Sequence, residues 1–270
     1  MYNYSYEYYL GRVSNPKIVV ITRVRNESLI ISDFLEHVST FCDAIIALDD
    51  CSTDNTLPIL QQHSKVTAII RNNKWERGNR TGQETAHRKL LNDITMRLFR
   101  PQWIIYMDAD ERLIGNIRIE LETLDYKNID YIRIPLFDAY MTNDDNLDIR
   151  EGEALINRRK YFGPERRDII FIWSSLSGAD FVLDDAREPT INSEKYLTLF
   201  KCQHFGKALS IKKWEEKCDY YINNFPGVYS DKWLKRKGHA IHEKSDFSTP
   251  LYPWGETLFD NAVIIHPIIP

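Results

Sequence analysis

The chain has 270 residues, enough for one large α/β domain or two small ones around a buried core. Its composition is that of a globular protein, with 43% hydrophobic and 27% charged residues. The formal net charge of -4 gives no support for a nucleic-acid partner. Length, composition and charge thus argue against nucleic-acid-binding and disordered proteins and favour a globular α/β protein.

The cysteines and apolar segments bear on the cellular location. Four cysteines without a C-x-x-C pair argue against a disulfide framework and a structural zinc site, and we interpret them as reduced thiols of a cytoplasmic protein. Residues 1–12 lack the regions of a signal peptide. The apolar runs have the length of strands, so we expect at most a peripheral membrane contact, at the inner face of the membrane.

Strands and helices alternate from Pro16 onwards. The β-branched run 18–21 predicts a strand buried on both faces of a parallel sheet. Apolar residues over 29–41 recur at helical spacing, and Asn26 or Ser28 is placed to cap this helix. The pattern further predicts strands over 44–48, 66–70 and 103–107 and helices over about 52–63 and 81–99.

Polar segments follow the predicted strands. Three strand–helix units and a fourth strand require a mostly parallel sheet with right-handed crossovers. Ligands of such sheets bind beyond the carboxyl ends of the strands. We therefore expect four polar segments to converge on one edge of the sheet, namely residues 22–27, 49–54, 71–75 and 108–112.

The pattern becomes irregular after Gly115. Strands are predicted over 131–135, 169–173 and 196–204, a polar loop over 142–150 and a helix over 211–223. From Phe225 the periodicity is weak, and we expect the tail to wrap over the body. We interpret residues 1–270 as a single domain with a first half (16–115), an irregular second half (116–224) and a C-terminal helical tail (225–270).

Asp108 and Asp110 form the sharpest local feature, a D-x-D triplet directly after a predicted strand. Two carboxylates at this spacing can approach one hard divalent cation, with diphosphate oxygens and water completing its shell. The cation would offset charge on a departing nucleoside diphosphate. Taken alone, the triplet fits a solvated acidic turn equally well.

Asp50 follows the second strand at the same edge, within the segment Asp49-Asp50-Cys51-Ser52-Thr53-Asp54. Its carboxylate can accept a hydrogen bond from the ring N–H of uracil or guanine. Ser52, Thr53 and Asp54 fit better as caps of the following helix. We therefore assign the base contact to Asp50 alone.

Together these segments resemble glycosyltransferase family 2, whose members have the GT-A fold. The resemblance covers residues 17–113 and thins beyond them to Lys201-Cys202-Gln203-His204-Phe205-Gly206 and the following helix, which are similar to bacterial members that build surface polysaccharide. The segments that carry it are Ile18-Val19-Val20-Ile21-Thr22-Arg23-Val24-Arg25-Asn26-Glu27, the turn Asp-Asp-x-Ser-Thr-Asp-x-Thr, Ala86-His87-Arg88, and Trp103-Ile104-Ile105-Tyr106-Met107-Asp108-Ala109-Asp110-Glu111.

The resemblance implies a hexosyltransferase-like enzyme with a Rossmann-like donor half (16–115) and an acceptor half (116–224). It would move a sugar from a UDP-, GDP- or dTDP-sugar to a glycan or lipid-linked acceptor with Mn²⁺ or Mg²⁺, in polysaccharide or glycan synthesis. The implied donor-binding residues are Thr22, Arg23, Asp50, Arg80, Arg88 and Asp108, and the implied metal ligands are Asp108, Asp110 and His204. The basic residues also fit a solvated helix face, and His204 also fits an ordinary hydrogen-bonded histidine.

Members of this family usually invert the anomeric centre in one displacement, and a carboxylate then takes the proton of the acceptor hydroxyl. We assign this role to Asp180, which lies in a turn of small residues that could admit a sugar. The other carboxylates considered for it are Asp168, Asp184 and Asp185.

Two alternatives stay open. A sugar nucleotidyltransferase shares the fold but requires a glycine-rich phosphate loop after the first strand, where this chain has no glycine. A catalytically silent protein that binds carbohydrate or nucleotide on the same fold has no need for the paired carboxylates, but sequence does not exclude it. A dinucleotide site is not indicated, because the Gly-x-Gly-x-x-Gly loop is missing.

Overall fold

The structure, a computed structural model of the whole chain, describes residues 3–76, 78–183, 186–225 and 227–265. In the first part of the chain strands alternate with helices, as predicted. The elements are β1 (Tyr4–Tyr8), η1 (Leu10–Arg12), β2 (Ile18–Val24), α1 (Ile31–Ser39), β3 (Ala44–Asp50), α2 (Thr56–Gln62), β4 (Val66–Asn72), α3 (Arg80–Leu98) and β5 (Trp103–Tyr106).

The second part contains longer strands and shorter helices. Its elements are β6 (Glu111–Ile114), α4 (Ile117–Thr123), β7 (Tyr131–Tyr140), β8 (Tyr161–Ser174), β9 (Tyr196–Thr198), β10 (Lys201–His204), α5 (Ile211–Asn224), α6 (Val228–Arg236), β11 (Tyr252–Pro253), α7 (Glu256–Asp260) and β12 (Val263–Ile264).

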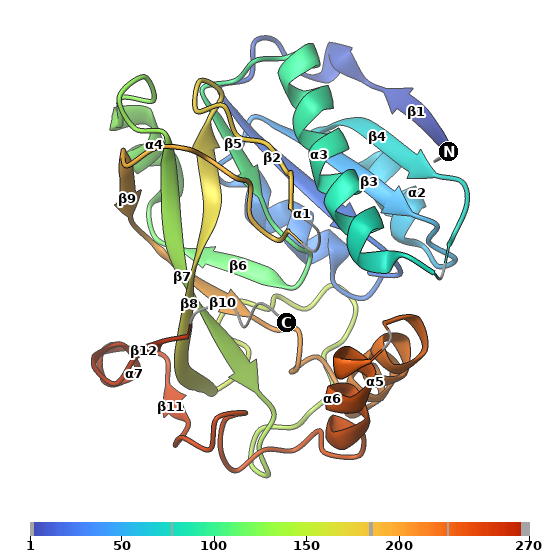
Figure 1. Cartoon of the computed structure of the whole chain (residues 1–270), viewed down its shortest axis with the longest axis vertical. Helices are drawn as coiled ribbons and strands as arrows, with labels where there is room; N and C mark the ends of the chain where they lie inside the picture. The colour runs from blue at the N-terminus through green and yellow to red at the C-terminus, as the bar shows by residue number, and fades with distance from the viewer. Residues whose placement is uncertain (1–2, 77, 184–185, 226, 266–270) are drawn as a thin grey trace.

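One sheet runs through both parts of the chain (Figure 1). The strand order is β1-β4-β3-β2-β5-β8-β7-β10-β6, with β9 beside β7 and with β11 and β12 beside β8. β2 to β5 are parallel, whereas β8 is antiparallel to both β5 and β7. The predicted α/β fold with a mostly parallel central sheet flanked by helices is confirmed.

Helices cover both faces of the parallel strands. Val20 of β2 shares one buried cluster with Phe34 of α1, and Ile21 shares the opposite cluster with Leu91 of α3. All four side chains are fully buried. Burying a side chain of this size contributes about 1.5–3 kcal/mol. Burial on both faces explains why residues 18–21 of β2 form an uninterrupted β-branched run.

The expected caps of α1 and α2 are only partly present. Neither Asn26 nor Ser28 caps α1, whose start lacks a side-chain cap. Asn26 Oδ1 instead accepts from the Thr53 N–H (2.7 Å), and the Ser28 N–H donates to Asp54 Oδ2 (3.0 Å). Of the three residues expected to cap α2, Asp54 bonds its first residue, because Asp54 Oδ1 accepts from the Thr56 N–H (3.0 Å). These side chains join two loops at the edge of the sheet.

Several strands differ from the sequence-based prediction. β1 was not expected; it pairs antiparallel with β4 at the edge of the sheet. β7 and β8 extend past the predicted apolar runs because they pair with each other as far as Tyr140 and Tyr161. The strand predicted over 196–204 is divided at Phe200, whose φ is +63°, into β9 and β10.

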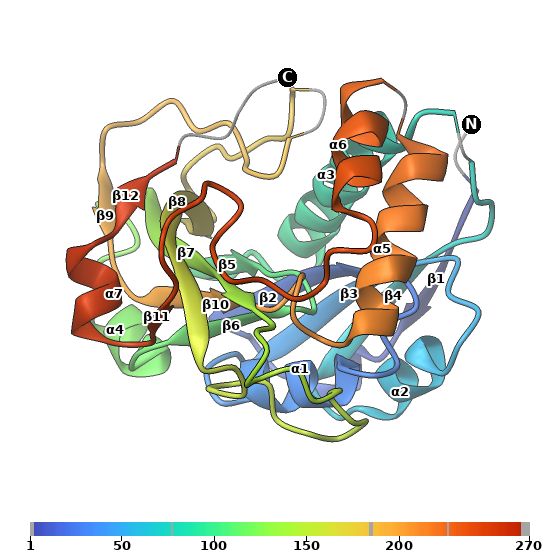
Figure 2. The same ribbon diagram turned by 90° about the horizontal axis from the view of Figure 1, so that it is seen from below.

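The last part of the chain packs on the body, as expected. β11 and β12 pair with β8, and α6 and α7 make the tail helical within its described residues. α5 and α6 lie side by side across the edge at which β2, β3 and β4 end (Figures 1 and 2). Within the described ranges, no helix has both the length and the apolar character needed to cross a bilayer. The division of the chain at residues 115 and 225 stays a prediction.

Candidate active site

The predicted polar segments meet at the carboxyl ends of β2, β3 and β4. Because these strands are parallel and in register, Val24 lies beside Asp49, and Asp50 lies beside Asn72. Arg25 Nη1 donates to the carbonyl oxygens of Asp50 (2.6 Å) and Cys51 (2.9 Å). The loops after β2 and β3 are therefore joined into one edge.

Asp50 lies at the centre of a buried ion-pair group. Its Oδ2 is 2.5 Å from both Arg23 Nη2 and Arg80 Nη2, and its Oδ1 accepts from Asn72 Nδ2 (2.7 Å). Burial by itself would raise the pKa of Asp50, but the two guanidinium groups hold it below the usual range. Three residues predicted to bind the donor, Arg23, Asp50 and Arg80, are thus in mutual contact. A base contact by Asp50 stays a prediction, and it would require an arginine to move aside.

Trp75 lies above this group between two arginines. The guanidinium carbon of Arg25 is 3.4 Å from the Trp75 ring centroid, and that of Arg80 is 3.7 Å away. Tyr220 of α5 approaches the same ring, with 6.0 Å between the centroids. Trp75 and the two guanidinium groups form a stack at the edge of the sheet, and the Tyr220 ring lies tilted beside it. Aromatic rings and guanidinium planes stack on further flat rings such as nucleobases. The sequence analysis placed Trp75 at this edge but gave it no role.

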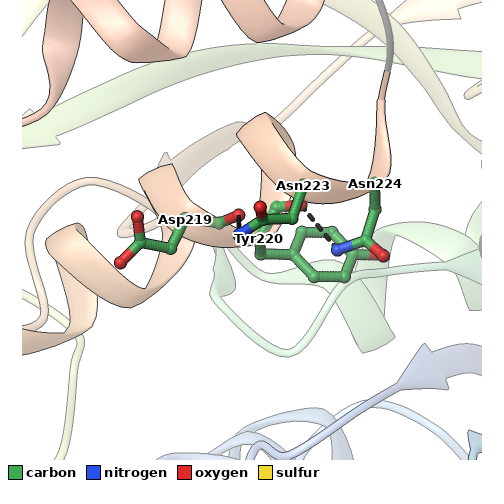
Figure 3. A pocket seen from close by; sticks show the side chains of 4 residues that line it. All are labelled: Asp219, Tyr220, Asn223 and Asn224. Atoms are coloured by element: carbon green, nitrogen blue, oxygen red, sulfur yellow. Dashed lines mark hydrogen bonds between the residues drawn. The ribbon is translucent and has the colours of Figure 1, made fainter.

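The hollow beside this stack is lined by α5. It has a volume of about 460 Å³ and is lined by Asp219, Tyr220, Asn223 and Asn224 (Figure 3). Asn223 and Asn224 each donate to the backbone carbonyl four residues earlier, at Asp219 and Tyr220. The lining is polar and lies on the face of α5 that carries Tyr220 toward Trp75.

Asp108 begins the turn after β5 and is bound by two neighbours. Its Oδ1 accepts from the Tyr106 hydroxyl (2.8 Å), and its Oδ2 lies 3.3 Å from Arg187 Nε. Arg88 Nε donates to the same hydroxyl (3.2 Å), so Arg88 reaches Asp108 through Tyr106. Thr22 lies within β2, fully buried, and its hydroxyl has no hydrogen-bond partner among the described residues.

Arg187 was not identified from the sequence. It binds Glu111 through Nη2 at 2.8 and 2.9 Å, and its Nη1 is buried without a partner among the described residues. Burial would lower the pKa of Arg187, but Glu111 and Asp108 raise it above the usual range. The second part of the chain thus places a permanent cation against the D-x-D triplet.

The order of the sheet brings His204 to Asp110. β10 lies between β6 and β7, and His204 is the register partner of both Glu111 and Asp138. His204 Nε2 lies 3.5 Å from Asp110 Oδ2, and the Asp110 carbonyl accepts from the Phe205 N–H (2.8 Å). The structure therefore joins two of the three predicted metal ligands, Asp110 and His204.

Asp138 holds the other nitrogen of the imidazole. Its Oδ1 lies 2.5 Å from His204 Nδ1, and its Oδ2 accepts from Lys207 Nζ (2.8 Å). Burial would lower the pKa of His204, but Asp110 and Asp138 raise it to about 9. A carboxylate on the second ring nitrogen is the usual support of a metal-binding histidine, because it orients the ring and increases its basicity.

The backbone of Gly206 packs closely against the ends of these side chains. A carbon placed as a Cβ on Gly206 would lie 2.6 Å from Lys217 Nζ, 2.7 Å from His204 Nε2 and 2.8 Å from Asp110 Oδ2. In the ranges that the structure describes, no group of three or more His, Cys, Asp or Glu side chains could hold an ion by itself. The donor set fits Mn²⁺ or Mg²⁺ once His204 releases a proton and if water and phosphate oxygens supply the remaining ligands, as is common for Mg²⁺.

Asp180 lies apart from this group. It is half-buried and pairs with Lys89 of α3, and its backbone pairs with Thr190. Asp168 of β8 has a buried Oδ1 without a hydrogen-bond partner in the described part of the chain. The other two carboxylates considered for the base, Asp184 and Asp185, lie outside the described residues. The base assignment to Asp180 stays a prediction.

Sequence reasoning missed Asp138, Gly206 and Lys217. Asp138 carried one signal, since it is a charged residue within the apolar run of β7. Gly206 directly follows His204 and Phe205, in the segment that resembles the family. Lys217 carried no local signal, because α5 contains two other lysines, Lys212 and Lys213.

Residues 19–121 match the profile of the family described as Glycosyl transferase family 2, which confirms the resemblance found in the sequence. The match contains every predicted donor-binding residue and both aspartates of the triplet. It ends before Asp180 and His204. The family comparison therefore bears on the first part of the site.

The curated relatives are two uncharacterized proteins, one of Mycobacterium tuberculosis and one of Mycobacterium bovis. Each is 31% identical over 100 residues, which is 35% of this chain. The aligned region is 23% of each relative, so this chain matches about a quarter of their length.

Similar solved structures include a mannosyltransferase of Pyrobaculum calidifontis in complex with GDP-Man and Mn²⁺. It is 12% identical, with a TM-score of 0.41 over 83% of this chain and 66% of that chain. Another is glucosyl-3-phosphoglycerate synthase of Mycobacterium tuberculosis with Mn²⁺, UDP and phosphoglyceric acid. It is 16% identical, with a TM-score of 0.31 over 48% of this chain and 45% of that chain.

Proposed function

We propose that this chain, whose residues 19–121 belong to glycosyl transferase family 2, transfers a sugar from a nucleoside diphosphate sugar to a carbohydrate or lipid-linked acceptor. One observation carries the proposal beyond the family match. Asp110 Oδ2 and His204 Nε2 lie 3.5 Å apart, and Asp138 supports the other nitrogen of the His204 ring. This is the arrangement that a metal-assisted transfer from a diphosphate requires.

Different residues would bind different parts of the donor. Asp110 and His204 would hold Mn²⁺ or Mg²⁺, Asp108 would have to turn toward the ion to join them, and the ion would balance charge on the departing diphosphate. Thr22 and Arg23 of β2, together with Asp50 and Arg80, would border the nucleotide next to Trp75. Arg88 would contribute to phosphate binding indirectly, because it binds the Tyr106 hydroxyl that donates to Asp108.

The transfer is a single displacement with inversion. The acceptor hydroxyl oxygen forms a bond to the anomeric carbon while the bond from that carbon to the diphosphate oxygen breaks. The hydroxyl proton passes to a carboxylate, for which Asp180 is our first choice and Asp168 the second. Asp168 is supported by its unpartnered buried Oδ1, whereas Asp180 would first have to release Lys89. A lipid-linked acceptor in surface polysaccharide synthesis would bring the protein to the inner face of the membrane.

A catalytically silent binding protein is the second candidate, and one observation favours it. Arg23 and Arg80 occupy the Asp50 carboxylate, and Lys217 lies 3.5 Å from Asp110, so protein cations already balance two of the acidic groups.

A binding and turnover experiment separates the two candidates. UDP-, GDP- and dTDP-sugars are tested by thermal shift with Mn²⁺ and with EDTA, and nucleotide release is then followed with and without acceptor sugars. A ligand at about 100 times its dissociation constant stabilises by about 2.7 kcal/mol. We expect the donors of one nucleobase to stabilise the protein, and to do so with Mn²⁺ but not with EDTA. Asp110→Asn should abolish both this stabilisation and nucleotide release.

The matched control is Asp125→Asn, which removes an exposed carboxylate after α4 and should behave as the parent. Stabilisation without nucleotide release from any donor would favour the silent protein. The absence of stabilisation by all nucleotides would refute the transferase and favour a silent protein that binds carbohydrate.

A further inference from the structure

Lys217 of α5 reaches the predicted metal position from the opposite side to the strands. Its Nζ lies 3.5 Å from Asp110 Oδ2, and its side chain is 29% exposed. The carbon position beside Gly206 that is 2.8 Å from Asp110 Oδ2 is 2.6 Å from this ammonium group. Lys217 thus lies beside the two predicted metal ligands Asp110 and His204.

The charges around Lys217 come from several elements. Asp110 lies in the turn after β5, His204 ends β10, and Glu27 follows β2. Burial and Asp110 raise the pKa of Glu27 to about 8, and Lys217 and Lys213 partly oppose this. Apart from Asp110, no carboxylate in the described ranges forms an ion pair with Lys217. The ammonium group is therefore held at the site by a carboxylate that a metal ion would also need.

A divalent cation and this ammonium group compete for Asp110. Two cations within about 4 Å of each other repel strongly in a partly buried site. The lysine stem has four methylene groups and can turn its charge elsewhere at little cost, and lysine binds phosphate well as a point charge. The diphosphate of a donor would be the nearest new anion once the metal neutralises Asp110.

We propose that Lys217 is a tethered cation that balances Asp110 in the metal-free protein and binds the donor diphosphate once metal occupies the site. The second half of this inference rests on the proposed function. α5 is also joined to the donor half through Tyr220 and Trp75, so the helix is in place to carry the lysine between the two anions. Lys217 is then a donor-binding residue supplied by the half of the chain outside the family match.

Replacing Lys217 by methionine should change the Mn²⁺ affinity and the nucleotide affinity in opposite directions. Lys217→Met keeps the length of the side chain and removes its charge. Without nucleotide, we expect the variant to bind Mn²⁺ about tenfold more tightly than the parent, because the competing cation is gone. With saturating Mn²⁺, we expect UDP and GDP to bind about tenfold more weakly, because a phosphate contact is lost. Mn²⁺ binding is measured by electron paramagnetic resonance, and nucleotide binding by calorimetry.

Lys213→Met is the matched control. Lys213 lies one turn earlier on α5 and pairs with Glu216 at 3.1 Å, so its loss removes the same charge without touching Asp110. Both affinities should stay within about twofold of the parent.

Each outcome decides something different. Mn²⁺ affinity that is unchanged or lower in Lys217→Met overturns the tethered cation, whatever the nucleotides do. Tighter Mn²⁺ binding with unchanged UDP and GDP affinity overturns the diphosphate contact alone. A parent protein that binds Mn²⁺ but no nucleotide refutes the proposed function, while its Mn²⁺ titrations still decide the first half of the inference. A parent that does not bind Mn²⁺ overturns both.

Discussion

Replacing Gly206 by alanine tests the metal position directly. Its φ is not in the left-handed region, so alanine fits the backbone, and such substitutions usually stabilise by about 0.4–1 kcal/mol through the unfolded state. The added methyl carbon would lie 2.7 Å from His204 Nε2 and 2.8 Å from Asp110 Oδ2. The fold should therefore persist while the space between the ligands is filled.

The size of the effect follows from the same distances. Metal–oxygen and metal–nitrogen bonds are about 2.1 Å long. An ion that binds both ligand atoms at this length needs them in their present positions, and a methyl carbon closer than van der Waals contact to both would displace them. We expect Mn²⁺ affinity to fall by at least about 100-fold, equivalent to about 2.8 kcal/mol. Calorimetry measures the affinity, and thermal unfolding without metal checks the fold.

Gly11→Ala is the control for this variant. Gly11 also has an ordinary φ, and its added carbon would meet no atom within 4 Å. It should bind Mn²⁺ as the parent does. If Gly206→Ala also retains parental Mn²⁺ affinity with an unchanged melting temperature, the ion does not bind between Asp110 and His204 beside Gly206, and our reasoning on the site is wrong.

Three further predictions concern other parts of the chain. Asp138→Asn should lower Mn²⁺ affinity by about 10- to 100-fold, since His204 loses its supporting carboxylate, and a parental calorimetric isotherm would contradict this. Burial, with Arg112 adding to it, lowers the pKa of His37 to about 4, so the unfolded chain binds the proton first and stability falls as the pH drops below about 6.5. We expect His37 alone to contribute a loss of about 2 kcal/mol between pH 7 and 5 in urea unfolding, and His37→Gln, which can still accept from the Leu113 N–H, should reduce the total loss by that amount. Asp180→Asn should retain nucleotide binding and reduce transfer by about 100-fold, and parental transfer would move the base to another carboxylate.

The parallel half of the fold could be predicted because its signals are local. Residues 18–21 of β2 are buried on both faces and are all apolar, and this run is visible in the sequence. Parallel strands also end at one edge, so the order of elements was sufficient to group Arg23, Asp50 and Asp108. The caps of α1 were predicted wrongly because Asn26 bonds the neighbouring loop, a contact that depends on strand pairing.

By itself, the sequence determined that Asp108 and Asp110 follow a buried strand and that Asp50 lies at the same edge. Only the tertiary structure determined which side chains of the second part of the chain contact these aspartates. The insertion of β10 between β6 and β7 sets His204 beside Asp110, and the crossing of α5 brings Lys217 to the same oxygen. Local periodicity records which face of an element is buried, but strand order and helix crossing follow from packing across the whole chain.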